Sequence, residues 1–342
     1  MKTTQIVHSN VLRYPFGISR GVATELPSVI YRIGDLGQGE GSPVRYKKQT
    51  AEQVVTALQA ISASVKESEL DNIEELDARV RKAMPQHSAA LAAFNIALWD
   101  AKGRREGKPI YQLLGTAKPT TETTYTVSLS DYDTMVERTR EAAHLPCLKI
   151  KLGKSEEFDI EVMKRIRAAA PNTTLRVDAN AGWTLQIALA IIPILADLGV
   201  EFVEQPLAIG NLEDLQRLHK MSPLPIIADE DAQDLQSLRA LRGRCSGINI
   251  KLMKCGGITE ALKMVQFARQ EGWKILVGCM IETRLGLGAA AHICGLVDYA
   301  DLDAHMLTRN DPFPPGSQTE YSAQLPLADG PGVGLPMVDI TD

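Results

Sequence analysis

Acidic and basic residues recur along the second half of this chain at nearly constant intervals. Lys151, Asp178, Glu204, Asp229 and Lys251 follow one another at intervals of 27, 26, 25 and 22 residues. Each stands at the end of a short apolar run typical of a β-strand. Three carboxylates without histidine or cysteine partners are hard oxygen ligands that suit Mg²⁺. Lysines on both sides of such a site indicate groups that move protons.

The interval corresponds to one strand followed by one helix. Residues at the carboxyl ends of barrel strands converge at one mouth, where barrel enzymes have their active sites. Side chains two residues apart in a strand share a face, so Lys149 points with Lys151, and Asp301 points with Asp303. The helix-facing side would bury each pair away from water, at a cost of several kcal/mol per ion. We therefore expect both pairs at the mouth, with a structural cap or surface pair as the alternative for the two aspartates.

Two lysines flanking a metal-bound carboxylate suit racemisation or epimerisation. A lysine beside a divalent cation and another lysine has a lowered pKa and can act as a neutral base. Lys151 would then remove an α-proton from one side while Lys251 delivers a proton from the other, or the reverse. Mg²⁺ and a further cation such as Lys149 would stabilise the enediolate. We expect Asn180 to be a donor to a metal ligand or a neutral ligand, and Glu230 to orient Lys251.

The residues between 116 and 312 show the alternation of elements that must position these side chains. Short apolar runs such as LKIKLG, LRVDAN, VEFVEQP and GINIKLM alternate with amphipathic stretches such as EEFDIEVMKRIRAAA and TEALKMVQFARQEG. This rhythm is typical of a parallel sheet with crossover helices. Eight such runs at a spacing of about 25 residues favour an α/β fold, a TIM-like (β/α)7β barrel, over an open sheet.

The residues before the barrel show a different pattern of apolar and polar residues. Residues 1–46 alternate like strands with turns, and residues 50–115 have apolar residues at helical spacing. We therefore predict an α+β capping domain over residues 1–115 and a catalytic barrel over 116–312. The tail, about 313–342, is rich in Gly and Pro, and we expect it to return to the capping domain.

Composition excludes several classes of protein. The chain has 342 residues, a net charge of −5 and 44% hydrophobic residues, as in an ordinary globular protein of two domains or a barrel with an addition. Without a cluster of Lys and Arg, we expect no nucleic-acid partner. The longest apolar run is interrupted by Pro193, so we expect no membrane span. We also expect a cytoplasmic protein, because no secretory signal is apparent and the five cysteines form no C-x-x-C pair.

Several segments resemble the enolase superfamily, muconate-lactonizing subgroup. They are ALAAFNIALWDAKGRREGKPIYQLLG at 90–115, the strand LKIKLG, the acids in VDAN, VEQP and ADE, and NIKLMKCGG. The segment MIETRLGLGAAAH at 280–292 and the sequence DLDAHML are most similar to the dipeptide epimerase family, which includes L-Ala-D/L-Glu epimerases. The resemblance covers nearly the whole chain.

The resemblance implies a Mg²⁺-dependent epimerase that takes a small dipeptide and inverts the α-carbon of its carboxyl-terminal residue. It implies that Lys151 and Lys251 are the acid/base pair, and that Asp178, Glu204 and Asp229 bind the metal. Asp301 and Asp303 would hold the α-ammonium group of the dipeptide. Further substrate contacts are expected from Thr126, Lys149 and Glu282. The loop 18–25 would cover the site and recognise the substrate side chain.

One position departs from the family pattern. Family members acting on L-Ala-L-Glu tend to carry an arginine in the loop where this chain has Ala23, and Arg20 is the candidate to replace it. Preference for an acidic side chain is therefore open, and apolar dipeptides become alternatives. Other reactions of the subgroup remain open too: N-acylamino acid racemisation, o-succinylbenzoate synthesis and muconate cycloisomerisation. A metabolite-binding protein without catalysis is the alternative of another class, and the resemblance allows a homo-oligomer.

Overall fold

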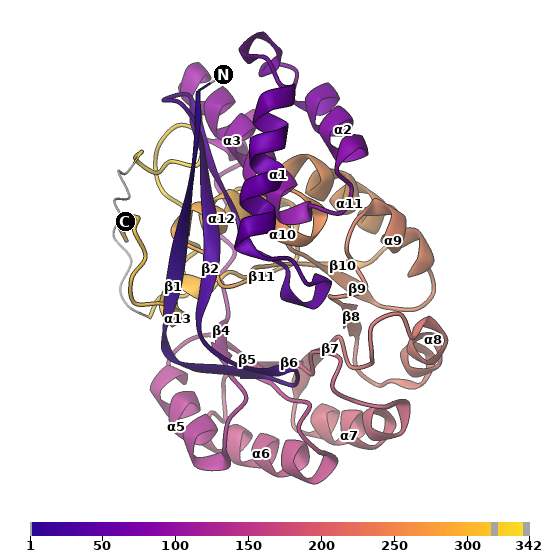
Figure 1. The fold of residues 1–342 in the computed structure, drawn as a ribbon. Coiled ribbons are helices and arrows are strands. Elements are labelled where there is room, and N and C mark those ends of the chain that lie inside the picture. The colour runs from indigo at the N-terminus through magenta and orange to yellow at the C-terminus, as the bar shows by residue number, and fades with distance from the viewer. Residues whose placement is uncertain (1, 316–320, 338–342) are drawn as a thin grey trace.

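The computed structural model describes residues 2–315 and 321–337 and consists of a barrel with a smaller α+β part lying over it (Figure 1). The barrel strands are all parallel and are hydrogen-bonded in chain order from β4 to β11. Their bounds are β4 (Tyr125–Val127), β5 (Cys147–Lys151), β6 (Thr174–Asp178), β7 (Val200–Glu204), β8 (Ile226–Ala228), β9 (Gly247–Ile250), β10 (Lys274–Gly278) and β11 (Tyr299–Asp301). The sheet curls back on itself, because Thr124 just before β4 donates its N–H to the carbonyl of Ala300 in β11. The predicted (β/α)7β barrel is confirmed.

Helices form the outer layer of the barrel. They are α5 (Tyr132–Ala142), α6 (Glu156–Ala169), α7 (Leu185–Asp197), α8 (Leu212–Met221), α9 (Leu235–Ala240), α10 (Leu252–Cys255), α11 (Ile258–Gln270), α12 (Arg284–Ala291), the 3-10 turn η3 (Cys294–Leu296) and α13 (Ala304–Leu307). Several begin at a capping side chain that accepts a main-chain N–H three residues on, as Asp131, Ser155 and Thr184 do. Helices α5, α7 and α11 bury apolar side chains and contact the barrel strands, α5 at β4, α7 at β7, and α11 at β9 and β10.

The N-terminal part pairs an antiparallel sheet with a buried helix. The sheet consists of β1 (Thr3–Ile18), β2 (Gly21–Ile33) and β3 (Gly37–Gly41). Alternate residues of β3 are glycines, and a Cβ at Gly39 would lie 2.1 Å from the carbonyl oxygen of Ala93 in α3 (Ser88–Glu106). Glycines on the strand and alanines on the helix therefore let the two backbones approach directly. This contact explains why the helical signature is so rich in alanine.

The remaining helices of this part are α1 (Ala51–Ser64), α2 (Ile73–Ala83) and α4 (Ile110–Leu113), with 3-10 turns η1 (Arg45–Lys47) and η2 (Glu67–Glu69). Helix α3 also seals the two parts together. The indole N–H of Trp99 and the side-chain amide of Asn95 both donate to the Thr259 hydroxyl at the start of α11, at 3.0 and 2.8 Å. The α+β part is thus anchored beside the mouth of the barrel.

The described end of the tail contacts the N-terminal part. Ile110 donates its N–H to the carbonyl of Gly332, and Val333 donates its N–H to the Asp100 carboxylate. Residues 316–320 and 338–342 of the predicted tail lie outside the described residues. The boundary at residue 115 stays a prediction, and β4 begins ten residues further on.

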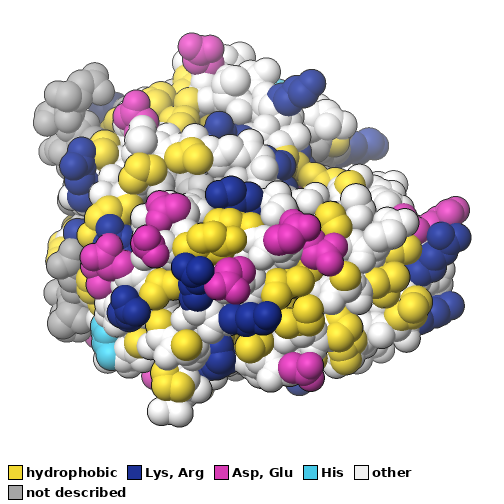
Figure 2. Space-filling view, turned by 90° about the horizontal axis from the view of Figure 1, so that it is seen from below, with side chains coloured by type: hydrophobic (Ala, Val, Ile, Leu, Met, Phe, Trp, Pro, Cys, Tyr) yellow, Lys and Arg dark blue, Asp and Glu magenta, His cyan; other side chains and the backbone are white. Residues whose placement is uncertain are grey.

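All five cysteines lie in the described part of the chain and carry free thiols. Among the helices that the structure describes, none has the combination of length and apolar sequence needed to cross a membrane. On the face of the molecule seen from below, acidic and basic side chains lie next to one another between apolar ones (Figure 2).

Candidate active site at the barrel mouth

A cavity of about 800 Å³ lies where the carboxyl ends of the barrel strands meet the N-terminal part. We call it the mouth cavity. The barrel contributes most of the charged side chains of its wall, and the β1–β2 hairpin together with residues 42–51 contributes apolar and polar ones. The barrel residues are Thr126, Lys149, Lys151, Asn180, Asp229, Glu230, Lys251, Cys279, Met280, Ile281, Asp301, Asp303 and Leu307.

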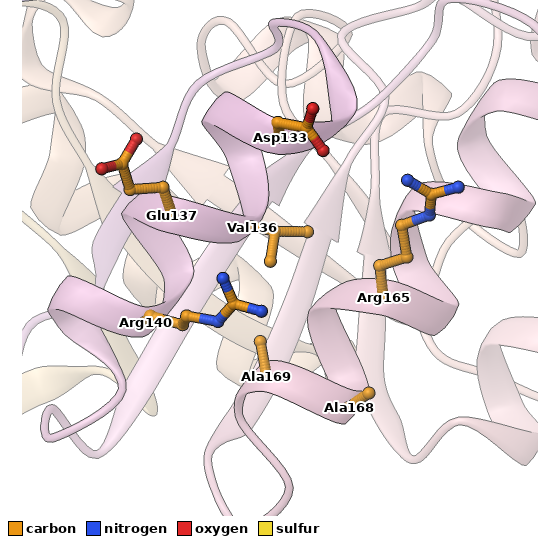
Figure 3. A pocket seen from close by; sticks show the side chains of 7 residues that line it. All are labelled: Asp133, Val136, Glu137, Arg140, Arg165, Ala168 and Ala169. Carbon is orange, nitrogen blue, oxygen red and sulfur yellow. The ribbon is translucent and has the colours of Figure 1, made fainter.

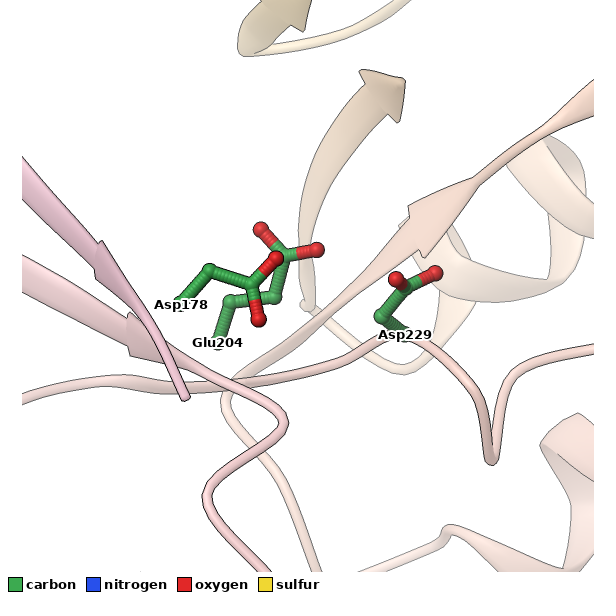
Figure 4. Close-up of side chains that lie close together, drawn as sticks. All are labelled: Asp178, Glu204 and Asp229. Atoms are coloured by element: carbon green, nitrogen blue, oxygen red, sulfur yellow. The ribbon is translucent and has the colours of Figure 1, made fainter. Parts of the chain in front are cut away.

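Three buried carboxylates converge at this mouth (Figure 4). Asp178 ends β6, Glu204 ends β7, and Asp229 follows β8 directly. One carboxylate oxygen of each lies within 4.8 Å of the others. Asp178 lies beside Lys151 and beside Glu204 in the register of the sheet, so the sheet itself aligns them. The regular spacing in the sequence predicted this meeting.

Lysines surround the acidic cluster. The Lys149 Nζ lies 2.7 Å from Glu204 Oε2 and 3.2 Å from Asp178 Oδ2. The Lys151 Nζ lies 2.7 Å from Asp178 Oδ2, and the Lys251 Nζ lies 2.9 Å from Asp229 Oδ2. The acids thus lie between Lys151 on β5 and Lys251 after β9, with Lys149 in the middle.

Burial and charge act in opposite directions on these lysines. Burial by itself lowers the pKa of Lys251, but the nearby carboxylates of Asp229, Glu204 and Glu230 together outweigh it and raise the pKa above its usual value. Lys149 follows the same pattern, with Asp301 and Glu204 raising its pKa. The lowered lysine pKa expected from the sequence is therefore not what the protein groups produce by themselves. Burial and the charge of Asp178 raise the pKa of Glu204 to about 8, a sign of crowded negative charge.

Asp301 ends β11, whereas Asp303 lies beyond the strand at the start of α13, so the two do not share a strand as expected; both line the cavity wall, with different partners. Asp301 accepts from the Lys149 ammonium at 2.7 Å and also from the Thr124 hydroxyl. Asp303 accepts from the main-chain N–H of Thr126 at 2.6 Å. Burial and the neighbouring charge of Asp301 raise the pKa of Asp303 to about 6. Asp303 is thus a buried acid with a cavity beside it.

Asn180 and Glu230 form a link to the hairpin tip. The Arg20 guanidinium donates to Glu230 Oε1 at 2.5 Å and to the carbonyl oxygen of Asn180 at 2.6 Å. The side-chain amide of Asn180 also donates to Asp178 Oδ2 at 3.2 Å. The hydrogen bonds of Glu230 Oε1 go to Arg20 and Asn180, and Lys251 is held by Asp229 instead. Glu230 thus hydrogen-bonds to the loop while its charge also acts on Lys251, and its role in orienting that lysine stays a prediction.

Two buried residues that the sequence patterns did not indicate also contact the cluster. The Asn249 side-chain amide donates to Glu204 Oε1 at 2.8 Å, and the Lys254 ammonium contacts Asp229 Oδ1 at 2.5 Å. Both lie within three residues of Lys251 in the segment NIKLMK. Asn249 lies two residues before Lys251, so the period of the strand is a signal that could have indicated it.

Glu282 lies behind the cavity rather than in its wall. It is 1% exposed, its Oε1 accepts from the N–H of Met280 at 2.7 Å, and its neighbour is the buried Glu40 of β3. Glu40 in turn accepts from the N–H groups of Thr283 and Gly286. Burial first and then the charge of Glu40 raise the pKa of Glu282 to about 8. This pair of acids joins the two parts of the molecule, which the sequence did not indicate.

Replacing Glu282 by glutamine is expected to stabilise the protein increasingly as the pH rises from 5 to 8. The folded carboxyl keeps its proton up to about pH 8, whereas an unfolded glutamate loses it near pH 4.3. The wild type therefore loses stability across this window, by up to about 1.4 kcal/mol per pH unit, while glutamine does not ionise. Unfolding in guanidinium chloride at pH 5 and pH 8 measures the difference. An equal difference at both pH values would contradict the assignment.

A second, more open pocket lies on the outside of the barrel between α5 and α6 (Figure 3). Asp133, Glu137 and Arg140 reach it from α5, and Arg165 reaches it from α6. Arg165 is already paired with Glu161 at 2.8 Å. The pocket lies away from the strand ends, and its lining is that of a charged helix surface.

Comparisons with known proteins agree with this geometry. Residues 1–115 match the model of the mandelate racemase / muconate lactonizing enzyme N-terminal domain, and residues 131–339 match that of the enolase C-terminal domain-like family. An L-Ala-D/L-Glu epimerase of Bacteroides thetaiotaomicron is 37% identical over 98% of this chain and 88% of its own length. A hydrophobic dipeptide epimerase of a Flavobacteria bacterium (strain MS024-2A) is 37% identical over 88% of each chain. The crystal structure of a dipeptide epimerase from Enterococcus faecalis, complexed with Mg and L-Leu-L-Tyr, matches with a TM-score of 0.93 at 33% identity over 98% of both chains. The chain therefore belongs to the mandelate racemase / muconate lactonizing enzyme family of the enolase superfamily, and within it to the dipeptide epimerases.

Proposed function

We propose that this protein is a Mg²⁺-dependent epimerase that inverts the α-carbon of the carboxyl-terminal residue of a dipeptide. The observation that carries the proposal is the placement of three buried carboxylates between Lys151 and Lys251 at one cavity. The named relatives are epimerases, which places the chain among the isomerases.

Asp178, Glu204 and Asp229 are the residues that would hold the metal. They offer oxygen atoms only, as Mg²⁺ prefers, and they lie within 4.8 Å of one another. The pKa of about 8 for Glu204 indicates negative charge that a cation would relieve. When bound, Mg²⁺ supplies positive charge that stabilises the substrate carboxylate as electron density builds on it.

Lys151 and Lys251 would act on opposite faces of the α-carbon, because they approach the acidic cluster from opposite ends. One, as a neutral amine, takes the α-proton, and the other, as an ammonium, delivers a proton to the opposite face. Asp229, the acid that raises the pKa of Lys251 most, is one of those that would bind the cation. Neutralising that carboxylate lowers the lysine pKa toward the range of a base.

Asp301 and Asp303 would bind the α-ammonium group of the dipeptide. Both line the mouth cavity, and Asp303 has no cationic side chain as a hydrogen-bond partner among the described residues. Thr126 and Lys149, in the same wall, would contact the substrate next to them. N-acylated substrates carry no ammonium group, so these aspartates favour a free dipeptide.

Arg20 supports a preference for uncharged carboxyl-terminal side chains. Its guanidinium is held by Glu230 and by the Asn180 carbonyl, so in this arrangement it offers no charge to an acidic side chain. The cavity wall beside it includes Ile18 and Val22. Alanine at position 23 adds no charge there. We therefore propose that apolar dipeptides are turned over better than L-Ala-L-Glu.

A dipeptide library incubated with the enzyme and Mg²⁺ in deuterated water tests the proposal. Every substrate whose α-proton exchanges gains one mass unit. We expect gain at the carboxyl-terminal residue, strongest for apolar side chains. Gain for N-acylated amino acids but not for free dipeptides would overturn the dipeptide assignment and favour the racemase alternative. Gain restricted to acidic side chains would overturn only the preference argued from Arg20.

The KM for dipeptides is expected to rise as the pH falls below about 6. Asp303 has its pKa raised to about 6, and its protonated form cannot pair with an ammonium group. Each further pH unit should raise KM by up to about tenfold, because one pKa unit corresponds to a tenfold change in the ionised fraction. Initial rates from pH 5 to 8 for the wild type and for Asp303→Asn measure this. An inflection that persists in Asp303→Asn would assign the effect to another group.

A further inference from the structure

A fourth buried lysine contacts the acidic cluster, and it is not part of the cavity wall. Lys254 lies in α10, the single helical turn that follows Lys251. Its Nζ contacts Asp229 Oδ1 at 2.5 Å, the carbonyl oxygen of Asn249 at 2.8 Å, and the carbonyl oxygen of Asp229 itself. The side chain is 1% exposed. A cation is therefore fixed beside one of the proposed metal ligands, in a place the substrate does not reach.

The contacts of Lys254 account for its full hydrogen-bonding capacity. An ammonium group has three N–H donors, and three acceptors surround this one. Lys254 is not part of the cavity wall, whereas Lys251 and Asp229 are. Lys254 has therefore neither the access nor the free position of an acid or base, and its effect must pass through Asp229.

Each of the three acids has one oxygen held by a donor and a second oxygen beside a lysine of the mouth. Asp178 Oδ1 accepts from the N–H of Asn180 at 2.8 Å, and Glu204 Oε1 accepts from Asn249 at 2.8 Å. For Asp229 the donor to Oδ1 is Lys254, while Oδ2 faces Lys251. The first two donors are neutral, and the third is a cation. The backbone of Asp229 is held as well, because its N–H donates to Gln205 at 2.9 Å.

We propose that Lys254 is a positioning residue that holds Asp229 Oδ1 away from the cavity, so that Oδ2 is the oxygen presented to Mg²⁺ and to Lys251. The proposal rests on the proposed assignment of Asp229 as a metal ligand. Groups that orient a ligand from outside the metal site typically change metal affinity or activity by 10- to 100-fold. Lys254 contributes that orientation to Asp229 from the same short segment that carries Lys251.

Charge and positioning predict opposite effects on metal affinity. Removing a positive charge so close to the site would by itself strengthen the binding of a cation. Removing the group that orients Asp229 frees its carboxylate to rotate and to pair with Lys251 through both oxygens, which weakens Mg²⁺ binding. The sign of the change in affinity therefore distinguishes the two roles.

Calorimetric titration of the metal-free protein with MgCl₂ tests the proposal, using Lys254→Met and Lys254→Gln. We expect the Mg²⁺ dissociation constant to rise about tenfold or more in Lys254→Met. Glutamine retains a side-chain N–H donor, so Lys254→Gln should show a smaller rise, and it serves if the methionine variant does not fold. In both variants kcat should fall more than KM changes, since Asp301 and Asp303 are untouched.

Arg81→Met is the matched control. Arg81 donates to the carbonyl oxygens of Cys255 and Gly256 at the end of α10 but does not contact Asp229. It should lower the melting temperature while leaving the Mg²⁺ dissociation constant within about twofold. Unchanged or tighter Mg²⁺ binding in Lys254→Met would overturn the proposal.

Asp229→Asn distinguishes a failure of the proposed metal site from a failure of the positioning role of Lys254. If the wild type binds Mg²⁺ and Asp229→Asn does not, the metal site holds and the Lys254 variants report on positioning alone. If Asp229→Asn binds Mg²⁺ as the wild type does, the ligand assignment fails first.

Discussion

Lys251→Ala is expected to reduce epimerisation by about 10³-fold or more while still allowing α-proton exchange in one configuration of the substrate. Lys151 remains in this variant and can remove a proton from its own face and return a deuteron to the same face. Inversion needs a proton from the opposite face, which Lys251 would deliver. Exchange without inversion is therefore the specific sign of a two-lysine mechanism. Mass spectrometry of the deuterated products, combined with chiral separation of the epimers, measures both quantities.

Lys151→Ala should give the mirror result, with exchange in the other configuration only. Lys251→Arg is the control for charge. In the wild type the Lys251 nitrogen lies 2.9 Å from Asp229, and an arginine keeps a cation there. The guanidinium, however, does not lose its proton near neutral pH and cannot act as a base. The arginine variant should be as inactive in inversion as the alanine variant. Inversion at the wild-type rate in any of these variants, or exchange in the same configuration for both alanine variants, would contradict the assignment of one lysine to each face.

The meeting of the acids was predictable because it depends on regular structure. A constant interval of one strand and one helix places Asp178, Glu204 and Asp229 at the same height on neighbouring strands. The two-residue period of a strand then places Lys149 with Lys151. Both rules depend only on nearby residues in the sequence. The parallel register of the sheet then places these residues side by side in space.

Contacts between distant elements could not be predicted in the same way. Glu40 meets the segment after β10 only because β3 packs on α3 and brings the two parts together. Glu282 therefore lies beside another acid instead of in the cavity wall, and its expected contact with substrate has no support in its position. The partner of Arg20 likewise depends on where the hairpin tip lies. The cytoplasmic location and a homo-oligomer stay predictions.

Removing Mg²⁺ is expected to abolish activity, by about 10³-fold or more, and added Mg²⁺ should restore it. The proposed site holds three buried carboxylates, and the negative charge that builds on a substrate carboxylate would be repelled by them without a cation. Dialysis against a chelator followed by titration with MgCl₂ measures the loss and the recovery. Full activity after chelation, with metal content checked by elemental analysis, would contradict the requirement.

Glu204→Gln should weaken Mg²⁺ binding by altering a single proposed ligand while leaving the fold in place. Glu204 Oε1 accepts from Asn249, so the glutamine oxygen takes that bond and its NH₂ group points toward Lys149 and the other acids. A donor then replaces an acceptor at the metal, and Mg²⁺ binding should weaken by about 100-fold or more. Glu201→Gln is the matched control on the same strand, because Glu201 pairs with Arg176 at 2.7 Å outside the cavity. Equal Mg²⁺ affinity in the two variants would show that Glu204 is not a metal ligand, because only the replacement of a residue that contacts the ion should weaken its binding.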